Sequence, residues 1–426
     1  MKVLVIGSGG REHTLCWKIA QSSAVDEVFC APGNGGIASD AICIDIAGDD
    51  IPSLIRFVKD NGIDLSVVGP EAPLVAGIVD AFAAENLAIF GPDRNAAALE
   101  GSKIFAKTAM AASAIPTARF ETFTDAERAV SFINTADFPI VVKADGLAAG
   151  KGVIVTSSRD EAIRAVQDIM VKREFGSAGS SVVLEEKLLG EEASFIAVCD
   201  GENIIPLASS QDHKPAYDND KGPNTGGMGA YSPAPVLDED TYSNVLDTIL
   251  YPLVYGLKKQ GITYRGVIYA GLMITADGPK VLEFNVRMGD PETQPLLMRL
   301  KSDIVPILME VAKGGSIKDM KLEWEDGPSV CVVLASGGYP GSYEKGKLIN
   351  GIDRAGTLDG IKVFHAGTRL QGKSLVTAGG RVLGVTALGD DLKSTIERAY
   401  RAVSEISFDQ MFFRKDIGHK ALKRLS

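Results

Sequence analysis

The sequence predicts an α/β protein that begins with a parallel β-sheet covered by helices. Residues 1–92 alternate short apolar runs with amphipathic stretches, and apolar runs dominate again from Pro139 onward. Uninterrupted apolar runs separated by helical patterns are typical of buried parallel strands with crossover helices. The expected strands of this first sheet are residues 3–6, 28–30, 41–46, 65–68 and 88–90. Apolar residues at positions 51, 54, 55 and 58 predict a helix before the fourth of them.

The sequence after residue 92 predicts further helices, strands and two long loops. An alanine-rich stretch, residues 95–112, predicts a helix. The expected strands after it are residues 140–143, 153–156, 182–186, 194–198, 267–275, 280–286, 329–335, 362–365 and 381–387, with a helix near 391–406. Two polar stretches, 144–152 and 209–235, are expected to be long loops, and loops of such length are usually functional.

Composition and charge exclude several classes of protein. The chain has 426 residues and a net charge of −11, without a run of Lys or Arg, so we expect no nucleic-acid partner. No window approaches the roughly 18 uninterrupted apolar residues of a membrane helix, and the first residues are too short in apolar length for a signal peptide. The five cysteines are scattered without metal-ligand spacing. We therefore expect a cytoplasmic protein without a membrane partner.

A glycine turn, Gly7-Ser8-Gly9-Gly10, follows the first expected strand. A dinucleotide-binding motif would need a third glycine where Glu12 stands and an acidic residue at the end of the next strand, where the sequence has Ala31-Pro32. Both departures disfavour dinucleotide binding. A tight turn, or a site for a monophosphate or other small anion at the helix N-terminus, remain as interpretations.

The glycine-rich stretch 144–152 superficially resembles a Walker loop. Only three residues separate Gly146 from Gly150, and Gly152 stands after Lys151 where Ser or Thr would ligate magnesium. The stretch also joins two expected strands instead of a strand and a helix. It is better interpreted as a flexible hairpin that covers a triphosphate, with an ordinary exposed hairpin as the alternative.

The strongest chemical signal lies in the expected strand around residue 283. Strand alternation places Glu283, Asn285 and Arg287 on one face. A carboxylate and an amide oxygen are hard ligands for Mg²⁺, and the neighbouring guanidinium can neutralise phosphoryl charge. The alternative is a surface strand whose polar face arose by chance.

Six segments in order along the whole chain resemble the ATP-grasp superfamily and, within it, the phosphoribosylamine–glycine ligase (glycinamide ribonucleotide synthetase) family. They are VIGSGGREH, KADGLAAGKGV, LEEKLLGEEASF, SQDHK, GPNTGGMGAYSP and EFNVRMGDPETQP. The resemblance implies a parallel-sheet pre-ATP-grasp domain over residues 1–102 and an ATP-grasp domain over 103–326, with a lid subdomain at about 120–190. A mostly β C-terminal domain would span 327–426.

The resemblance also implies a nucleotide site made of Lys103, Lys143, Gly150, Lys151, Gly152, Glu185, Glu186, Leu188 and Glu192. The two lysines before the glycines would contact the ATP phosphates. Glu185 would accept a hydrogen bond from the adenine amino group, and the backbone just after it would contact the ring edge. Glu192 would hold the ribose hydroxyls.

For the reacting groups, the resemblance implies that Glu283 and Asn285 ligate Mg²⁺ or Mn²⁺ and that Arg287 stabilises an acyl phosphate. It implies substrate contacts from Gly9, Gly10, Asp212, Gly226, Gly227 and Arg287. Two departures limit this transfer. No second metal carboxylate stands in residues 269–273, and Pro215 stands where relatives often have arginine, so no phosphate-binding role is assigned there.

The implied reaction joins glycine to 5-phosphoribosylamine with ATP, through glycyl phosphate, to give glycinamide ribonucleotide in purine biosynthesis. The expected assembly is a monomer or weak homodimer. Another purine-pathway ATP-grasp carboxylate ligase is the alternative within the fold. A nicotinamide-dependent dehydrogenase on the N-terminal sheet and a nucleotide-binding module without turnover are the alternatives from other classes.

Overall fold

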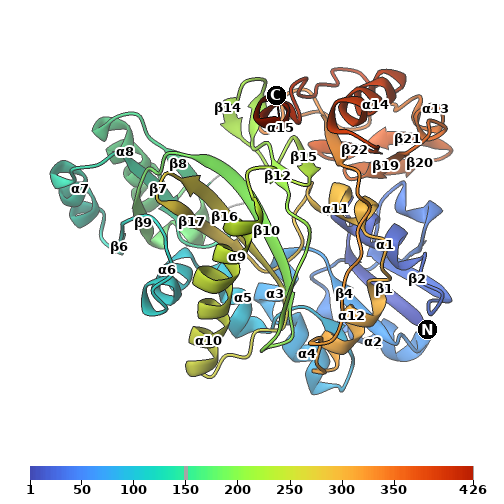
Figure 1. Ribbon diagram of the computed structural model, residues 1–426, viewed down its shortest axis with the longest axis horizontal. Coiled ribbons are helices and arrows are strands. Elements are labelled where there is room, and N and C mark those ends of the chain that lie inside the picture. The colour runs from blue at the N-terminus through green and yellow to red at the C-terminus, as the bar shows by residue number, and fades with distance from the viewer. Residues whose placement is uncertain (148–151, 426) are drawn as a thin grey trace.

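The N-terminal hundred residues form the parallel sheet that the sequence predicts. The computed structural model describes residues 1–147 and 152–425 (Figure 1). The sheet has the strand order β3-β2-β1-β4-β5, and every pair is parallel. Its strands are β1 (Lys2–Gly7), β2 (Glu27–Pro32), β3 (Ile42–Cys43), β4 (Leu65–Val68) and β5 (Ile89–Phe90). The helices around it are α1 (Gly10–Ile19), α2 (Ile51–Asn61), α3 (Glu71–Ala76), α4 (Ile78–Ala84) and α5 (Arg94–Gly101), with a 3₁₀ turn at Ile37–Ser39.

Local sequence explains where the predicted helices begin and end. The Asp50 carboxylate accepts a hydrogen bond of 3.2 Å from the Ser53 N–H and so caps the start of α2. The same helix ends at Gly62, which has φ 61°, a conformation that glycine adopts without steric cost. The predicted helical stretch 95–112 is two helices, α5 and α6 (Lys103–Ala112), because Ser102 adopts an extended conformation and its hydroxyl caps the second helix.

A small antiparallel sheet with its own core follows. Its strand order is β6-β9-β7-β8, and the strands are β6 (Phe120–Phe123), β7 (Ile140–Ala144), β8 (Val153–Val155) and β9 (Val182–Glu186). The helical segments packed with it are α7 (Ala126–Thr135), α8 (Arg159–Val166), a π-turn at Gln167–Val171 and a 3₁₀ segment at Gly176–Ser180. Its buried cluster, which includes Ile133, Val142 and Leu184, contains residues of this unit alone.

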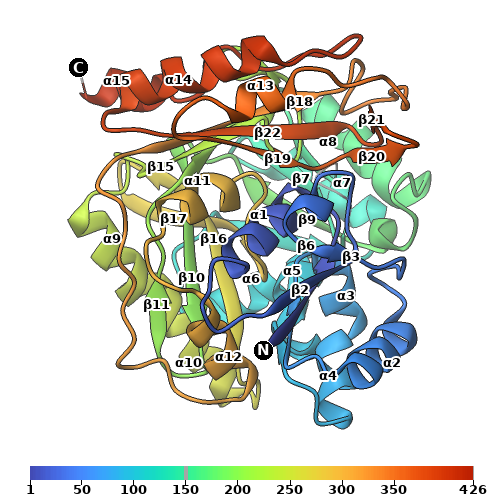
Figure 2. The ribbon, with the colours of Figure 1, turned by 90° about the vertical axis from the view of Figure 1, so that its right-hand side faces the viewer.

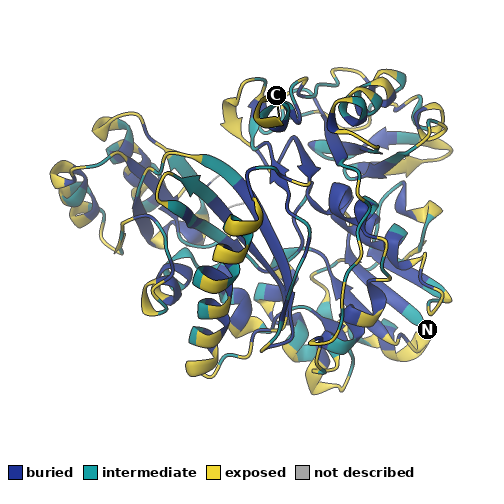
Figure 3. Ribbon diagram, in the orientation of Figure 1, coloured by how far each residue is buried: buried dark blue, intermediate teal, exposed yellow. Residues whose placement is uncertain are grey.

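The central antiparallel sheet has the order β11-β10-β16-β17. Its strands are β10 (Glu191–Cys199), β11 (Ile204–Pro206), β16 (Gly266–Thr275) and β17 (Gly278–Asn285). The nearby helices are α9 (Glu239–Val245), a π-turn at Leu246–Leu250, α10 (Tyr251–Lys259), α11 (Thr293–Arg299) and α12 (Val305–Ala312). The buried strands and the exposed outer face of α10 are distinct in Figure 3.

The prediction that 209–235 is a long loop is wrong. This stretch forms β12 (Gln211–Asp212), β13 (Pro215–Tyr217), β14 (Lys221–Asn224) and β15 (Gly229–Ser232). The middle two make a hairpin, whereas β12 and β15 join the C-terminal sheet through pairing of β15 with β18. The loop-like composition hid strands that are stabilised by a partner about a hundred residues further along the chain.

The C-terminal sheet has the order β12-β15-β18-β22-β19 and is antiparallel, as predicted for a mostly β region. Its remaining strands are β18 (Ser329–Ala335), β19 (Ile361–His365) and β22 (Arg381–Leu388), beside the hairpin β20 (Thr368–Gln371) and β21 (Ser374–Thr377). The helices of this part are α13 (Ile352–Gly356), α14 (Leu392–Glu405) and α15 (His419–Leu425). This layer lies across α1 and α11 (Figure 2).

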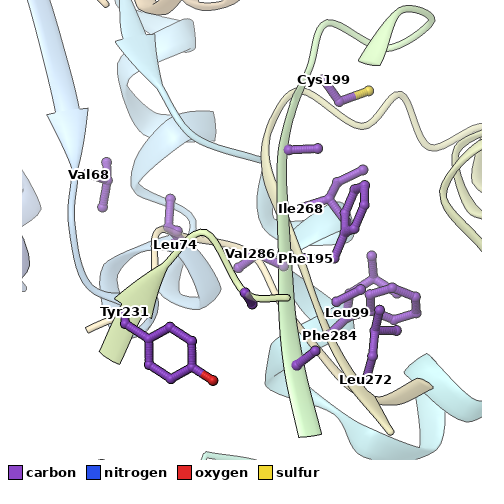
Figure 4. Packing of buried hydrophobic residues seen from close by; sticks show 14 of the residues in the cluster. Val68, Leu74, Leu99, Phe195, Cys199, Tyr231, Ile268, Leu272, Phe284 and Val286 are labelled. Carbon is purple, nitrogen blue, oxygen red and sulfur yellow. The ribbon is translucent and has the colours of Figure 1, made fainter. Parts of the chain in front are cut away.

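One hydrophobic cluster joins the N-terminal part to the central sheet. Figure 4 shows Val68 and Leu74 on the N-terminal side, and Phe195, Ile268 and Phe284 on the central sheet. Because the two parts share a core, their positions relative to each other are fixed. None of the helices in the described part of the chain has the length and apolar character needed to cross a bilayer.

Candidate active site

A cavity of about 890 Å³ lies where the N-terminal loops, the central sheet and the C-terminal segment meet. The predicted site residues that line it are Gly9, Lys103, Lys143, Gly152, Glu185, Asp212, Gly226, Glu283, Asn285 and Arg287. The predicted residues that do not line it are Gly10, Glu186, Leu188, Glu192 and Gly227. Glu192 instead lines an adjoining cavity of about 640 Å³, which shares Asp212 and Lys214 with the first. The predictions for Gly150 and Lys151 lie outside the described residues.

The polar end of β17 presents the two expected metal ligands. A bulge opposite Gly271 and Leu272 changes the register of this strand, and both Glu283 and Asn285 reach the cavity. Within residues 1–147 and 152–425, no group of three or more His, Cys, Asp or Glu side chains is arranged to hold a metal. A carboxylate and an amide oxygen suit a hard cation whose remaining ligands come from phosphate and water. The donor set therefore fits Mg²⁺ or Mn²⁺ bound together with a nucleotide.

Arg287 projects into the same cavity and is held by carboxylates from two N-terminal helices. Its Nη2 donates to Glu100 Oε1 at 2.9 Å and to Asn285 Oδ1 at 2.9 Å, and its Nε lies 3.5 Å from Glu71 Oε2. Burial disfavours its charge, but the two carboxylates outweigh that effect and raise the pKa of Arg287. Among the described residues, Arg287 forms no salt bridge to its sequence neighbours Asp290 and Glu292: Asp290 faces Arg381, and Glu292 accepts from Tyr269 and Ser194.

Three further cations surround the inner end of the cavity. Glu185 is buried between two of them, with Lys143 Nζ 2.9 Å from Oε2 and Lys107 Nζ 3.2 Å from Oε1. Burial lowers the pKa of Lys107 to about 8, although Glu185 opposes this effect. The Lys103 ammonium donates to the Gly146 carbonyl at 3.0 Å, and burial lowers its pKa, against the opposing effect of Glu283. This cluster gives the cavity a positively charged end suited to phosphate oxygens.

Lys214 links the two cavities. Its Nζ lies 2.8 Å from Glu192 Oε2 and 3.1 Å from Asp212 Oδ1. Burial is the main reason that the pKa of Asp212 is raised to about 7, with Lys214 opposing the shift and Glu292 adding to it. The attraction of Lys214 lowers the pKa of Glu192. The predicted ribose ligand is therefore already paired with a lysine that sequence reasoning assigned to no role.

The N-terminus of α1, where a small anion was one of the expectations, is occupied by carboxylates of the protein. Glu12 accepts from the Gly9 N–H, and Asp290 accepts from the Arg11 N–H at 3.4 Å. Gly7 has φ 131°, and a Cβ there would lie 2.5 Å from the Glu12 side chain, so the turn needs glycine for close packing. These contacts favour the tight-turn interpretation, and substrate binding by Gly9 and Gly10 stays a prediction.

Arg381 from β22 fixes the turn at Gly226 and Gly227. Its Nη1 donates to the carbonyl of Gly226 at 2.6 Å and to that of Asp290 at 2.5 Å, while the Gly226 N–H donates to the Tyr339 hydroxyl at 3.0 Å. A Cβ at Gly226 would approach the guanidinium carbon to 2.9 Å. The C-terminal segment thus determines the conformation of a predicted substrate loop.

Comparisons with known proteins agree with this geometry along the whole chain. Three family models match in succession: the N domain of phosphoribosylglycinamide synthetase at residues 1–100, its ATP-grasp (A) domain at 101–293 and its C domain at 329–420. The chain belongs to the phosphoribosylglycinamide synthetase family. The resemblance deduced from the six motifs is thereby confirmed, as is the ATP-grasp fold class.

Individual members of the family are similar over their full length. The phosphoribosylamine–glycine ligase of Vibrio cholerae serotype O1 is 53% identical over 427 residues, covering 100% of this chain and 99% of the relative. The enzyme of that name from Rhodopirellula baltica is 51% identical over 426 residues, covering 99% and 98%. The crystal structure of phosphoribosylamine–glycine ligase from Thermotoga maritima superposes with a TM-score of 0.85 at 33% identity, covering 98% of this chain and 100% of that one.

The fold extends beyond the synthetase family. Biotin carboxylase from Campylobacter jejuni matches with a TM-score of 0.74 at 16% identity, covering 97% of this chain and 93% of that chain, which shows a common fold. Five residues of this chain line the cavity although the sequence assigned them no role: Glu71, Glu100, Lys107, Lys214 and Arg381. One of them had a usable signal, because Lys107 follows Lys103 by one helical turn and shares its face.

Proposed function

We propose that this protein joins glycine to 5-phosphoribosylamine at the expense of ATP, giving glycinamide ribonucleotide, ADP and phosphate. One observation carries the proposal: a single cavity unites the Glu283–Asn285 oxygen pair, Arg287 and the lysines 103 and 143. Relatives more than half identical over the whole chain are named phosphoribosylamine–glycine ligases. These residue types are the ones that phosphoryl transfer to a carboxylate requires.

The first step of the proposed reaction brings anions together. A glycine carboxylate oxygen attacks the γ-phosphorus, the bond to ADP breaks, and glycyl phosphate forms. Lys103 and Lys143 bind and orient phosphate oxygens, and Arg287 neutralises the charge that develops on the transferred group. Glu283 and Asn285 would hold Mg²⁺ or Mn²⁺, which when bound supplies further neutralisation of the phosphates.

In the second step the amine of phosphoribosylamine attacks the acyl carbon, and phosphate leaves with the former carboxylate oxygen. The protein needs no nucleophile of its own for either step. Its contribution is to position both substrates and to exclude water from the acyl phosphate, which hydrolyses readily. The N-terminal loops, the turn at Gly226 and the C-terminal Tyr339 also line the cavity and suit the two substrates.

Phosphate release with ATP and phosphoribosylamine tests the proposal, with glycine, formate and bicarbonate compared as the carboxylate substrate. Glycine-dependent release, with the ribonucleotide product identified by mass, is the expected result. Release that depends on formate or bicarbonate instead would assign the protein to another ATP-grasp ligase activity. A cytoplasmic location, a monomeric or weakly dimeric state, and domains over 1–102, 103–326 and 327–426 complete the proposal.

A further inference from the structure

Glu100 in α5 makes two short contacts to the segment that carries Arg287. Its Oε1 accepts from Arg287 Nη2 at 2.9 Å, and its Oε2 accepts from the Val286 backbone N–H at 2.8 Å. The Glu100 side chain is 8% exposed. One buried carboxylate from the N-terminal part thus fixes both the guanidinium and the backbone next to it.

Glu71 in α3 contacts the same guanidinium differently. Its Oε2 lies 3.5 Å from Arg287 Nε, its side chain is 32% exposed, and it lines the cavity. Arg287 Nε is buried and has no hydrogen-bond partner among the described residues. A buried guanidinium N–H without a partner is costly, and a carboxylate slightly too far away does not satisfy it. The Nε edge therefore has an unmet capacity for an anionic oxygen, whereas the Nη2 edge is already used.

We infer that Glu100 is the positioning residue for Arg287. Glu71 contacts Arg287 weakly, and an oxyanion of the bound substrates takes its place at Nε. The inference rests on the proposed function, because Arg287 acts there on the transferred phosphoryl group. Glu100 holds Arg287 by two bonds, one to its guanidinium and one to the backbone N–H of the residue before it. Arg287 Nη2 also donates to Asn285 Oδ1 at 2.9 Å. By holding the guanidinium, Glu100 therefore also orients Asn285, a predicted metal ligand.

The test compares Glu100→Gln with Glu71→Gln in the full chain, with Mg-ATP, glycine and phosphoribosylamine. Glutamine keeps the size and one oxygen acceptor but loses the charge that orients the guanidinium. Glu100→Gln should lower kcat about 100-fold, as a misplaced reacting group does, with the KM for ATP changed less than about twofold. Glu71→Gln should change kcat less than about fivefold, as for a partly exposed ion pair, and should lower the KM for glycine. Equal losses of kcat in both variants would contradict the inference.

A double-mutant cycle separates positioning from a general structural role. If Glu100 acts through Arg287, Glu100→Gln should cost less than about threefold in kcat when Arg287 is already lysine. The same fold-loss in both backgrounds, or a loss explained by a lower melting temperature, would overturn the assignment. Should Glu100→Gln not fold, Glu100→Asp keeps the charge, withdraws it by one methylene and carries the same expectation. Wild-type protein without glycine-dependent turnover would refute the proposed function, whereas an active wild type with an unaffected Glu100→Gln refutes only this inference.

Discussion

Replacing Asp212 by asparagine should make the protein more stable at neutral and alkaline pH. The Asp212 side chain is 5% exposed, and burial is the main cause that raises its pKa from 3.8 to about 7, despite Lys214 at 3.1 Å. In the window between these two values the unfolded chain has lost the proton that the folded protein keeps. Stability of the wild type therefore falls as pH rises through this window, and the fall ends above pH 7. Asparagine resembles the protonated carboxyl and does not ionise, so the variant does not lose stability as the pH rises through this window.

The difference between the pKa values sets the magnitude. At 1.36 kcal/mol for each pH unit it sets an upper limit of a few kcal/mol, from which the lost attraction between Asp212 and Lys214 subtracts. Urea denaturation from pH 4 to pH 8.5 measures it: the gain of Asp212→Asn should be near zero at pH 4, grow with pH and level off above pH 7. Asp416→Asn is the control of opposite sign. Although burial opposes it, the pairing with Arg414 lowers the pKa of Asp416, so this variant should lose stability at every pH above about 4.

The reasoning is refuted if Asp212→Asn is no more stable than the wild type at pH 8. Such a result would mean that Lys214 compensates the buried charge fully. Activity should respond in the opposite direction, because Asp212 lines the cavity and orients Lys214. A variant that gains stability and loses turnover would show that this buried charge is retained for function at the expense of folding.

Three other substitutions test the nucleotide and metal sites. Glu283→Gln should abolish most turnover while the fold survives, with partial rescue by excess Mg²⁺; near wild-type activity at low Mg²⁺ would exclude Glu283 from the metal site. Glu192→Ala should raise the KM for ATP more than it lowers kcat, because it removes a charged hydrogen bond that contributes about 1.5–3 kcal/mol to the binding free energy. An unchanged KM for ATP would mean that the ribose binds elsewhere. Arg287→Lys should lower kcat and kcat/KM together with ATP binding nearly intact, because lysine lacks the planar fork; a stable, fully active variant would contradict a transition-state role.

The first sheet and the polar strand β17 were predictable because their patterns are local. Strand β1 is an uninterrupted apolar run and is buried on both faces, and alternation along β17 brings Glu283 and Asn285 to one cavity, which Arg287 also lines from just beyond the end of the strand. Six motifs in order were enough to name the family. The register bulge opposite Gly271 was not predictable, because it depends on how β16 and β17 fit each other in space.

Non-local pairing explains what the sequence did not reveal. Strands β12 and β15 have two and four residues, and β15 is stabilised by pairing with β18. No periodicity can be read from so few residues. The helical pattern of residues 95–112 assigned no role to Glu100, whose contact to Arg287 spans 187 residues. Sequence spacing carries no information on such a pair, so the sequence predicted a catalytic role for Arg287 but did not predict the carboxylate that holds it.

Lys103, Lys143 and Arg287 differ in whether a carboxylate of the protein already neutralises their charge, and this difference determines how strongly each attracts a phosphate. Lys143 and Arg287 each have a carboxylate oxygen at 2.9 Å, so part of their attraction for an incoming anion is already used. Lys103 has no ion pair among the described residues and donates to the carbonyl of Gly146. Burial lowers its pKa, since a buried ammonium without a counter-ion is unfavourable, and a bound phosphate would supply that counter-ion and raise the pKa again. Because Lys103 is not already paired with a carboxylate, we expect its removal to weaken ATP binding in the ground state more than removal of Lys143 or Arg287 would.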